Sequence, residues 1–232
     1  MKSLWAVALV SVCTVLSFAQ VKEVEITSEP SHHLALENHY VRAFQVEIAP
    51  HAASLMHRHR HDYMFVTLGP SEVSNQVEGK AAVTLKLQDG ETRFLPGNFA
   101  HIATNLSNSP FRNVTIEFLQ DKTPPAAPAT WDEDRGLHIL HGGTEEIVFV
   151  EDGARASEVE LQIAGVDPGH KSARPLLLVA VTDLVLRSNS SGKEPSNVEM
   201  KSGDVKWFSR GLTHELTNVG GQGAEYVVVE FQ

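Results

Sequence analysis

The sequence of 232 residues contains a single cysteine, Cys13. Cys13 lies in a segment that we expect to be removed, so the remaining chain would have no disulfide, thiolate metal ligand or cysteine nucleophile. The sequence also lacks a serine nucleophile elbow, a phosphate-binding P-loop and a dinucleotide-binding glycine fingerprint. Thiol chemistry is therefore excluded, and no common motif points to a nucleotide-dependent enzyme.

Positive charge is scarce as well. The chain has 19 Lys and Arg against 29 Asp and Glu, which gives a formal net charge of −10. This balance argues against nucleic acid and against anionic membrane surfaces as partners. A small organic molecule is the partner that we expect, and self-association into a homodimer stays open.

The N-terminal segment has the layout of a secretory signal peptide. Lys2 supplies a positive start, an apolar run follows from Leu4 to Leu16, and Ser17-Phe18-Ala19 offers small residues before a cleavage site. The apolar run is shorter than the roughly 20 residues of a membrane-spanning helix. We expect residues 1–19 to be cleaved and the protein to be secreted or periplasmic, with no membrane anchor after cleavage.

Long amphipathic helical patterns are missing, and short β-rich runs between turn signals take their place. Several runs alternate polar and apolar residues, as Thr84-Leu85-Lys86-Leu87 does, which is the period of a half-buried strand. The sequence therefore predicts an all-β sandwich or barrel. The expected strands are Val41–Ile48, Tyr63–Leu68, Ala82–Leu87, Val114–Leu119, Ile147–Val150, Val159–Ile163, Leu176–Leu186 and Tyr226–Phe231.

The chain also repeats itself. Gly90–Pro96 resembles Gly203–Ser209, and at the same offset of 113 residues His101 matches His214. Farther upstream, Val46–Ala49 resembles Leu161–Ala164 at an offset of 115. A repeat of this length predicts two copies of one domain. We expect a first barrel over residues 20–122, a proline-rich linker over 123–134 and a second barrel over 135–232.

The densest cluster of potential metal ligands lies around His57. His57 and His59 are two residues apart, so on a strand both imidazoles project from one face. Neutral imidazole nitrogens bind divalent metals, and His101 is the candidate third ligand. With ordinary histidine pKa values, metal occupancy would fall as the pH drops through about 6.5.

A family resemblance becomes specific at these residues. Gly90, Pro96, His101 and Asn105 stand at the spacings of the second cupin motif, and Asn98 replaces its second glycine.

The first cupin motif is matched as well: Pro50 is followed seven residues later by His57-x-His59. The resemblance covers most of residues 41–119 and, more weakly, residues 159–231. It implies two tandem antiparallel β-barrels of the jelly-roll type. It also implies one divalent transition metal in the first barrel, with iron favoured and manganese, zinc, nickel or copper as alternatives.

One departure from the cupin pattern concerns the fourth ligand. Cupins usually place a glutamate three or four residues beyond the second histidine, where this chain has Tyr63 and Met64. Asp62, His61 or water are the alternatives for that position. Tyr63 is the candidate catalytic residue, as a hydrogen-bond donor to substrate.

The second copy has lost the first motif. At the offset of 115, His57 aligns with Ser172 and His59 with Arg174, although His214 survives. We therefore expect the second barrel to be free of metal. These observations predict a metal-dependent enzyme, an oxygenase acting on a small organic substrate, with a metal-dependent isomerase, lyase or hydrolase as alternatives. A non-catalytic ligand-binding or structural protein is the competing interpretation, because fold alone does not fix function.

Overall fold

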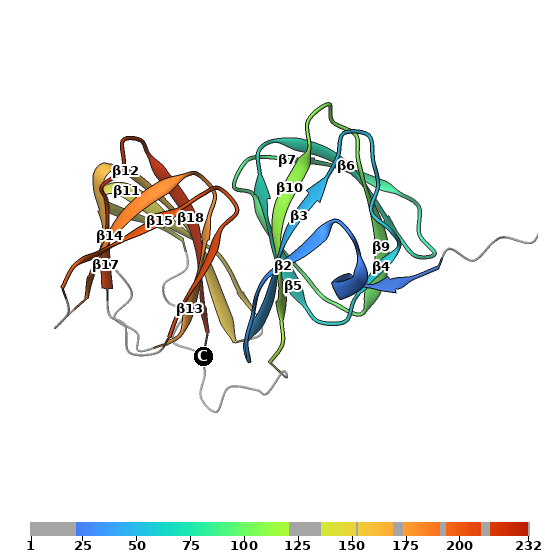
Figure 1. Ribbon diagram of the computed structural model, residues 1–232, viewed down its shortest axis with the longest axis horizontal. Coiled ribbons are helices and arrows are strands. Elements are labelled where there is room, and N and C mark those ends of the chain that lie inside the picture. Colours follow the sequence, from blue (N-terminus) through green and yellow to red (C-terminus); the bar gives the residue numbers. More distant parts are fainter. Residues whose placement is uncertain are drawn as a thin grey trace, which may run out of the picture.

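The computed structural model describes residues 22–120, 136–151, 153–168, 174–190, 194–209 and 214–231. These residues form strands and one short 3₁₀ helix, and they build two β-barrels side by side (Figure 1). The expectation of an all-β fold with two tandem barrels is confirmed. The expected signal peptide and linker lie outside the described residues. Within the described ranges, no helix is long and apolar enough to cross a membrane.

The first barrel consists of two five-stranded sheets, with strand orders β1-β4-β9-β6-β7 and β2-β3-β10-β5-β8. All pairings are antiparallel except that of β1 with β4. The elements are β1 (Val24–Glu25), η1 (Ile26–Ser28), β2 (His32–Glu37), β3 (Val41–Ile48), β4 (His57–His59), β5 (Tyr63–Leu68), β6 (Ser71–Val77), β7 (Val83–Leu87), β8 (Thr92–Leu95), β9 (Phe99–Asn105) and β10 (Phe111–Phe118).

The second barrel is one eight-stranded sheet with the order β15-β14-β17-β12-β18-β13-β16, and β11 pairs with β12 off this path. Its pairings are all antiparallel among the residues described. The strands are β11 (Leu137–Glu151), β12 (Ala154–Asp167), β13 (Leu176–Ala180), β14 (Leu184–Ser190), β15 (Ser196–Met200), β16 (Val205–Phe208), β17 (His214–Asn218) and β18 (Ala224–Phe231).

One expected strand is wrong. The run Leu176–Leu186 forms two strands, because β13 ends at Ala180 and β14 begins at Leu184. The amide groups of Val181 and Thr182 both donate to the carbonyl oxygen of Glu225, which turns the chain away from β18. The run therefore contains a turn without glycine or proline, at which Thr182 and Asp183 are the polar residues.

The pairing registers correct the alignment of the two halves. In the first barrel Ile48 pairs with Phe111, and in the second Leu161 pairs with Ala224, so both partners differ by 113 residues. The same offset relates β5 to β13, since Tyr63 pairs with Glu117 and Leu176 pairs with Glu230. The offset of 115 expected for the upstream segment is therefore wrong, and 113 holds from β3 to β18.

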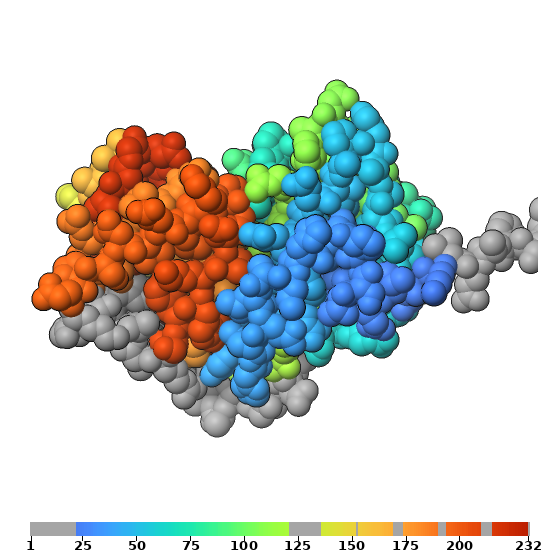
Figure 2. Space-filling model, in the orientation of Figure 1, coloured from blue at the N-terminus to red at the C-terminus, as the bar shows by residue number. Residues whose placement is uncertain are grey.

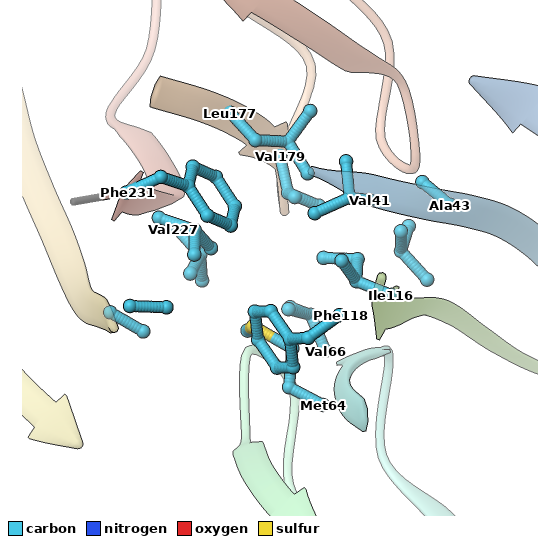
Figure 3. Packing of buried hydrophobic residues seen from close by; sticks show 14 of the residues in the cluster. Val41, Ala43, Met64, Val66, Ile116, Phe118, Leu177, Val179, Val227 and Phe231 are labelled. Atoms are coloured by element: carbon cyan, nitrogen blue, oxygen red, sulfur yellow. The ribbon is translucent and has the colours of Figure 1, made fainter. Parts of the chain in front are cut away.

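The strand alternation divides the apolar side chains between two kinds of core. The interior of the first barrel contains Phe44, Val46, Ile48 and Phe111, and the second barrel has its own interior cluster around Tyr226. Side chains of opposite orientation on the same strands form a third cluster, which includes residues of both barrels (Figure 3). The space-filling view shows the two lobes in broad contact (Figure 2).

This third cluster joins the barrels through equivalent surfaces. All of its buried residues fall into pairs related by the offset of 113. The pairs are Val41 and Ala154, Ala43 and Ala156, Met64 and Leu177, Val66 and Val179, Leu68 and Val181, Val114 and Val227, Ile116 and Val229, and Phe118 and Phe231. The barrels therefore pack with pseudo-twofold symmetry, each offering the same sheet face to the other.

Candidate metal centre

Three histidines meet inside the first barrel. β4 pairs with β9 so that His57 lies opposite His101, and His59 lies two residues farther along β4 on the same face. One nitrogen of each ring lies within 4.8 Å of the corresponding nitrogens of the other two. His57 and His59 are each 1% exposed and His101 is 9% exposed, so the cluster is buried.

Two of the three rings are held by hydrogen bonds from Nδ1. His57 Nδ1 donates to the carbonyl oxygen of Leu55 at 2.9 Å, and His101 Nδ1 donates to Asn75 Oδ1 at 2.6 Å. With the proton on Nδ1, the Nε2 atom keeps its lone pair, and His57 Nε2 has no hydrogen-bond partner although it is buried. Metal-ligating histidines typically carry such an anchor on their other nitrogen.

The third ring completes the arrangement. His59 Nε2 lies 3.2 Å from His101 Nε2. Because His101 carries its proton on Nδ1, this contact needs either a proton on His59 Nε2 or a cation between the two nitrogens. Two imidazole nitrogens that are each about 2.1 Å from one ion, at about a right angle, would have a similar separation. The three residues therefore fit a divalent metal.

The surroundings keep these imidazoles neutral. Burial, together with the nearby His32 ring, lowers the pKa of His57 to about 4. Burial and the charge that His57 would carry lower the pKa of His101 to about 3. Burial and the neighbouring histidines hold the pKa of His59 far below its usual range. At neutral pH the rings are therefore already in the form that binds metal.

A buried carboxyl group faces the far side of His59. Glu117, on β10, is 1% exposed, and its Oε1 lies 3.8 Å from His59 Nδ1 without a hydrogen-bond partner. Its other oxygen accepts a bond from Arg42 Nη1 at 3.4 Å. Burial raises the pKa of Glu117 to about 7, against the lowering effect of Arg42. The carboxylate of Glu117 therefore faces Nδ1 of His59 and would favour the ring proton on that atom, which leaves Nε2 for a metal.

Tyr63, the candidate catalytic residue, lies directly against the cluster. Its ring stacks on that of His59 with a centroid distance of 3.9 Å and an interplanar angle of 14°. Burial and the charge of Glu117 raise the pKa of Tyr63, so the phenol stays protonated. The ring of Phe99 also lies near, 5.9 Å from His59 and 5.4 Å from His101. Aromatic side chains therefore cover one side of the cluster.

The structure does not bring His61 and Asp62 to the three nitrogens. β4 ends at His59, so the strand alternation that would turn His61 inward stops before it. Asp62 Oδ1 accepts a hydrogen bond from the Gly97 amide at 2.7 Å. A Cβ on Gly97 would lie 2.2 Å from the His61 carbonyl oxygen, so this close approach requires glycine. His61 and Asp62 thus hold the loop after β4 against the turn at Gly97 of the second motif.

The substitution of Asn98 for a motif glycine is explained by its backbone. Asn98 has a φ of 65°, in the left-handed region that glycine prefers and that asparagine tolerates best among other residues. Its amide donates to the carbonyl oxygen of His59. The second motif therefore keeps its turn geometry, and β9 starts in the register that places His101 opposite His57.

Sequence reasoning missed two further residues, His32 and Glu29, near the cluster. The His32 ring centroid lies 4.7 Å from that of His57 and 6.5 Å from that of His59. Glu29 accepts a hydrogen bond from His32 Nδ1 at 2.6 Å. Neither residue belongs to a cupin motif, and both precede the first motif in sequence. They lie beside the triad only because the two sheets of the barrel close on each other.

In the second barrel, the offset of 113 assigns His170 to the position of His57, Ser172 to that of His59 and His214 to that of His101. This corrects the earlier pairing with Ser172 and Arg174, and Arg174 instead corresponds to His61. Residues 170 and 172 and the side chain of His214 lie outside the described residues.

No family model matches the sequence, and no curated protein matches it. Solved structures do match. A single-residue variant of oxalate decarboxylase from Bacillus subtilis has a TM-score of 0.62 and 11% sequence identity, and the match covers 88% of this chain and 76% of that chain. A structure of the same enzyme concerned with its Mn(II) centres has a TM-score of 0.61 with the same identity and coverage. At this identity the likeness concerns the fold: the chain has the two-barrel fold of oxalate decarboxylase, a bicupin, with a histidine triad suited to a divalent metal in its first barrel.

Proposed function

We propose that the protein is a metal-dependent enzyme that acts on a small, oxygen-bearing organic substrate in its first barrel. His57, His59 and His101 hold one divalent transition metal through Nε2. The observation that carries this proposal is the convergence of three buried, neutral imidazoles, two of which are locked by hydrogen bonds on Nδ1. A structural role would not require an unpartnered Nε2 in the interior of a barrel.

Bound at this site, the metal would supply Lewis acidity and open coordination positions for substrate oxygens, and for dioxygen in an oxygenase. Iron is the metal that the resemblance to the cupin motifs favours. Manganese is supported by the neighbouring structure of oxalate decarboxylase that concerns Mn(II) centres. Either metal suits imidazole ligands completed by oxygen donors.

The surrounding residues have distinct tasks. Tyr63 and Phe99 exclude water from one side of the triad, and the Tyr63 hydroxyl is the candidate donor to a substrate oxygen. Glu117 Oε1 faces His59 Nδ1 at 3.8 Å, so its carboxylate would favour the ring proton on Nδ1 and leave Nε2 available. Tyr63, Phe99 and Glu117 can perform these roles from the positions that they occupy in the fold.

The fold neighbours suggest a substrate class. Oxalate decarboxylase is named for a small dicarboxylate, and a small carboxylate suits open metal positions next to a protonated tyrosine. We therefore propose small carboxylic acids as the first substrates to test. Secretion or periplasmic export, with Gln20 as the first residue of the mature chain, is part of the proposal. Mass spectrometry of exported material would reject it by finding Met1 retained.

Metal analysis combined with an activity screen tests the function. The full chain, loaded with Fe(II) or Mn(II), should contain about one metal ion and should release carbon dioxide or consume dioxygen with a member of a small carboxylate panel that includes oxalate. The His101→Ala variant should lose both metal and activity, and His214→Ala should keep both. Metal-free wild-type protein after loading would overturn the proposal.

A non-catalytic metal-binding protein is the second candidate, and one observation favours it. His57 and His59 are almost fully buried, and Tyr63 stacks on the triad, which leaves little exposed surface at the site. Stoichiometric metal without turnover of any panel member, in both Fe(II) and Mn(II) forms, would support this second function.

A further inference from the structure

We propose that His32, held by Glu29, is a fourth protein ligand of the metal centre, contributed by the opposite sheet of the barrel. This inference rests on the proposed metal site and deepens it. It assigns a residue outside both cupin motifs to the place left by the missing glutamate.

The strand register directs the His32 side chain into the barrel. His32 on β2 pairs with Val46 on β3, and Val46 belongs to the interior cluster. Directly paired residues project from the same face of a sheet. The triad belongs to the other sheet of the same barrel, through β4 and β9. His32 therefore approaches the triad from across the interior.

The His32 ring is oriented as a ligand would be. Its side chain is 4% exposed, and its Nδ1 donates to Glu29 Oε2 at 2.6 Å. Glu29 is itself fixed, because it accepts the amide groups of Leu55 at 3.0 Å and Ser31 at 2.9 Å. The proton is thus held on Nδ1 and the lone pair on Nε2, which is the arrangement of a carboxylate–histidine–metal unit.

The distances place His32 beside the triad. Its ring centroid is 4.7 Å from that of His57, while the rings of His57 and His101 are 4.4 Å apart. The distance from His32 to the ring of His59 is 6.5 Å. His32 therefore flanks the triad on the His57 side, just outside the group of nitrogens that lie within 4.8 Å of one another.

The second barrel shows that this unit is not a requirement of the fold. By the offset of 113, Glu145 takes the place of His32 and Gly142 takes that of Glu29. Glu145 accepts a bond from Arg155 Nη2 at 3.4 Å instead. A histidine paired with a carboxylate thus stands at this position only in the barrel that carries the described triad.

Charge balance also favours the assignment. Three neutral imidazoles leave both charges of a divalent ion uncompensated in a buried site, which is costly. Glu29 accepts hydrogen bonds from His32 Nδ1 and from the amide groups of Ser31 and Leu55. Hydrogen bonds to a carboxylate favour its charged form, so Glu29 places negative charge one imidazole away from the ion.

Cobalt(II) is a suitable probe, because its visible spectrum reports coordination number and geometry independently of catalysis. We would compare the wild-type chain with His32→Ala and His32→Asn, since asparagine can keep the bond to Glu29 while removing Nε2. His33→Ala is the matched control, because His33 is the exposed neighbour on the same strand. Affinity would be measured by competition with a chelator, and circular dichroism would verify folding.

Both His32 variants should bind Co(II) about 10- to 100-fold more weakly, with an altered visible spectrum, and His33→Ala should match the wild type. Wild-type affinity and spectrum in folded His32→Asn would overturn the assignment while leaving the triad intact. Failure of the wild-type chain to bind Co(II) would instead overturn the proposed metal site itself. An unfolded His32→Ala variant would leave the decision to His32→Asn.

Discussion

Asn105 and Asn218 make the same hydrogen bonds in the two barrels. Asn105 Nδ2 donates to three carbonyl oxygens, those of Ile48, Ala49 and Ser109. The oxygens that accept from Asn218 Nδ2 belong to residues 161, 162 and 222, each 113 positions later. Each asparagine also accepts a backbone amide through Oδ1, and both are buried. Through these hydrogen bonds, the motif asparagine holds a strand end and the following turn in a fixed relative position.

Replacement of either asparagine by alanine should lower the free energy of unfolding by about 2–4 kcal/mol, because buried backbone groups lose their partner. Equilibrium urea denaturation of Asn105→Ala and Asn218→Ala measures the effect. We expect similar losses in the two variants. A loss below about 0.5 kcal/mol in either one would show that water replaces the side chain.

Glu117 and Glu230 form a matched pair for testing the role of the carboxylate behind His59. Arg42 contacts Glu117, and Arg155 contacts Glu230 at 3.0 Å, in equivalent positions. Glu117→Gln should weaken metal binding about 10- to 100-fold, because it replaces the carboxylate that faces His59 Nδ1 with a neutral amide. Glu230→Gln should leave metal affinity unchanged. Calorimetric titration of both variants with Mn(II) would contradict this expectation if their affinities were equal.

Metal occupancy should resist acid more than ordinary histidines would allow. Protons displace the metal only at pH values low enough to protonate a ring in the folded protein. Burial lowers the pKa of His57 to about 4 and that of His101 to about 3. Occupancy should therefore persist to about pH 5 and fall between about pH 4 and pH 3. This replaces the expectation of release near pH 6.5. Dialysis across this range with elemental analysis measures it, and complete release by pH 6 would contradict it.

The stability of the metal-free protein should depend on pH in a different window. The folded-state pKa values of His57 and His101 are lowered, so between about pH 6.5 and pH 4 the unfolded chain binds protons that the folded chain does not. The free energy of unfolding should fall with falling pH there, by up to about 1.4 kcal/mol per pH unit for each histidine. His101→Asn should show a shallower slope. The free energy of unfolding would be measured by urea denaturation at a series of pH values. Equal slopes against pH for the wild-type chain and His101→Asn would show that protonation of His101 does not destabilise the folded state.

The sequence allowed much of the fold to be predicted because alternation and repetition are local properties. Strands β3 and β5 have the bounds expected for them, since Asn38 and Pro50 flank β3, and Asp62 and Gly69 flank β5. The turn at residues 181–183 was missed, because hydrogen bonds to Glu225, far away in sequence, create it. The triad was also accessible, since two strand-spaced histidines and one motif histidine converge when β4 pairs with β9.

The surroundings of the triad could not be predicted in the same way. His32 and Glu29 reach the site only because the two sheets close into a barrel, and no local pattern reports that closure. The sequence does contain a pattern from which the burial of Glu117 could have been predicted. Glu117 lies between apolar Ile116 and Phe118 on an expected strand, and the same arrangement recurs at Glu230. A repeated acidic residue on the inner face of a strand indicates a buried partner, here an arginine.

The cluster that joins the barrels bears on how the two-barrel chain arose and on how either barrel would behave alone. Equivalent residues from two copies of one domain meet across a pseudo-twofold axis, which is the form of interface found in symmetric homodimers. A single ancestral barrel with this face would have bound a second copy of itself, and fusion of two copies makes that contact independent of concentration. Either barrel expressed alone would present the same apolar face to solvent and would self-associate through it.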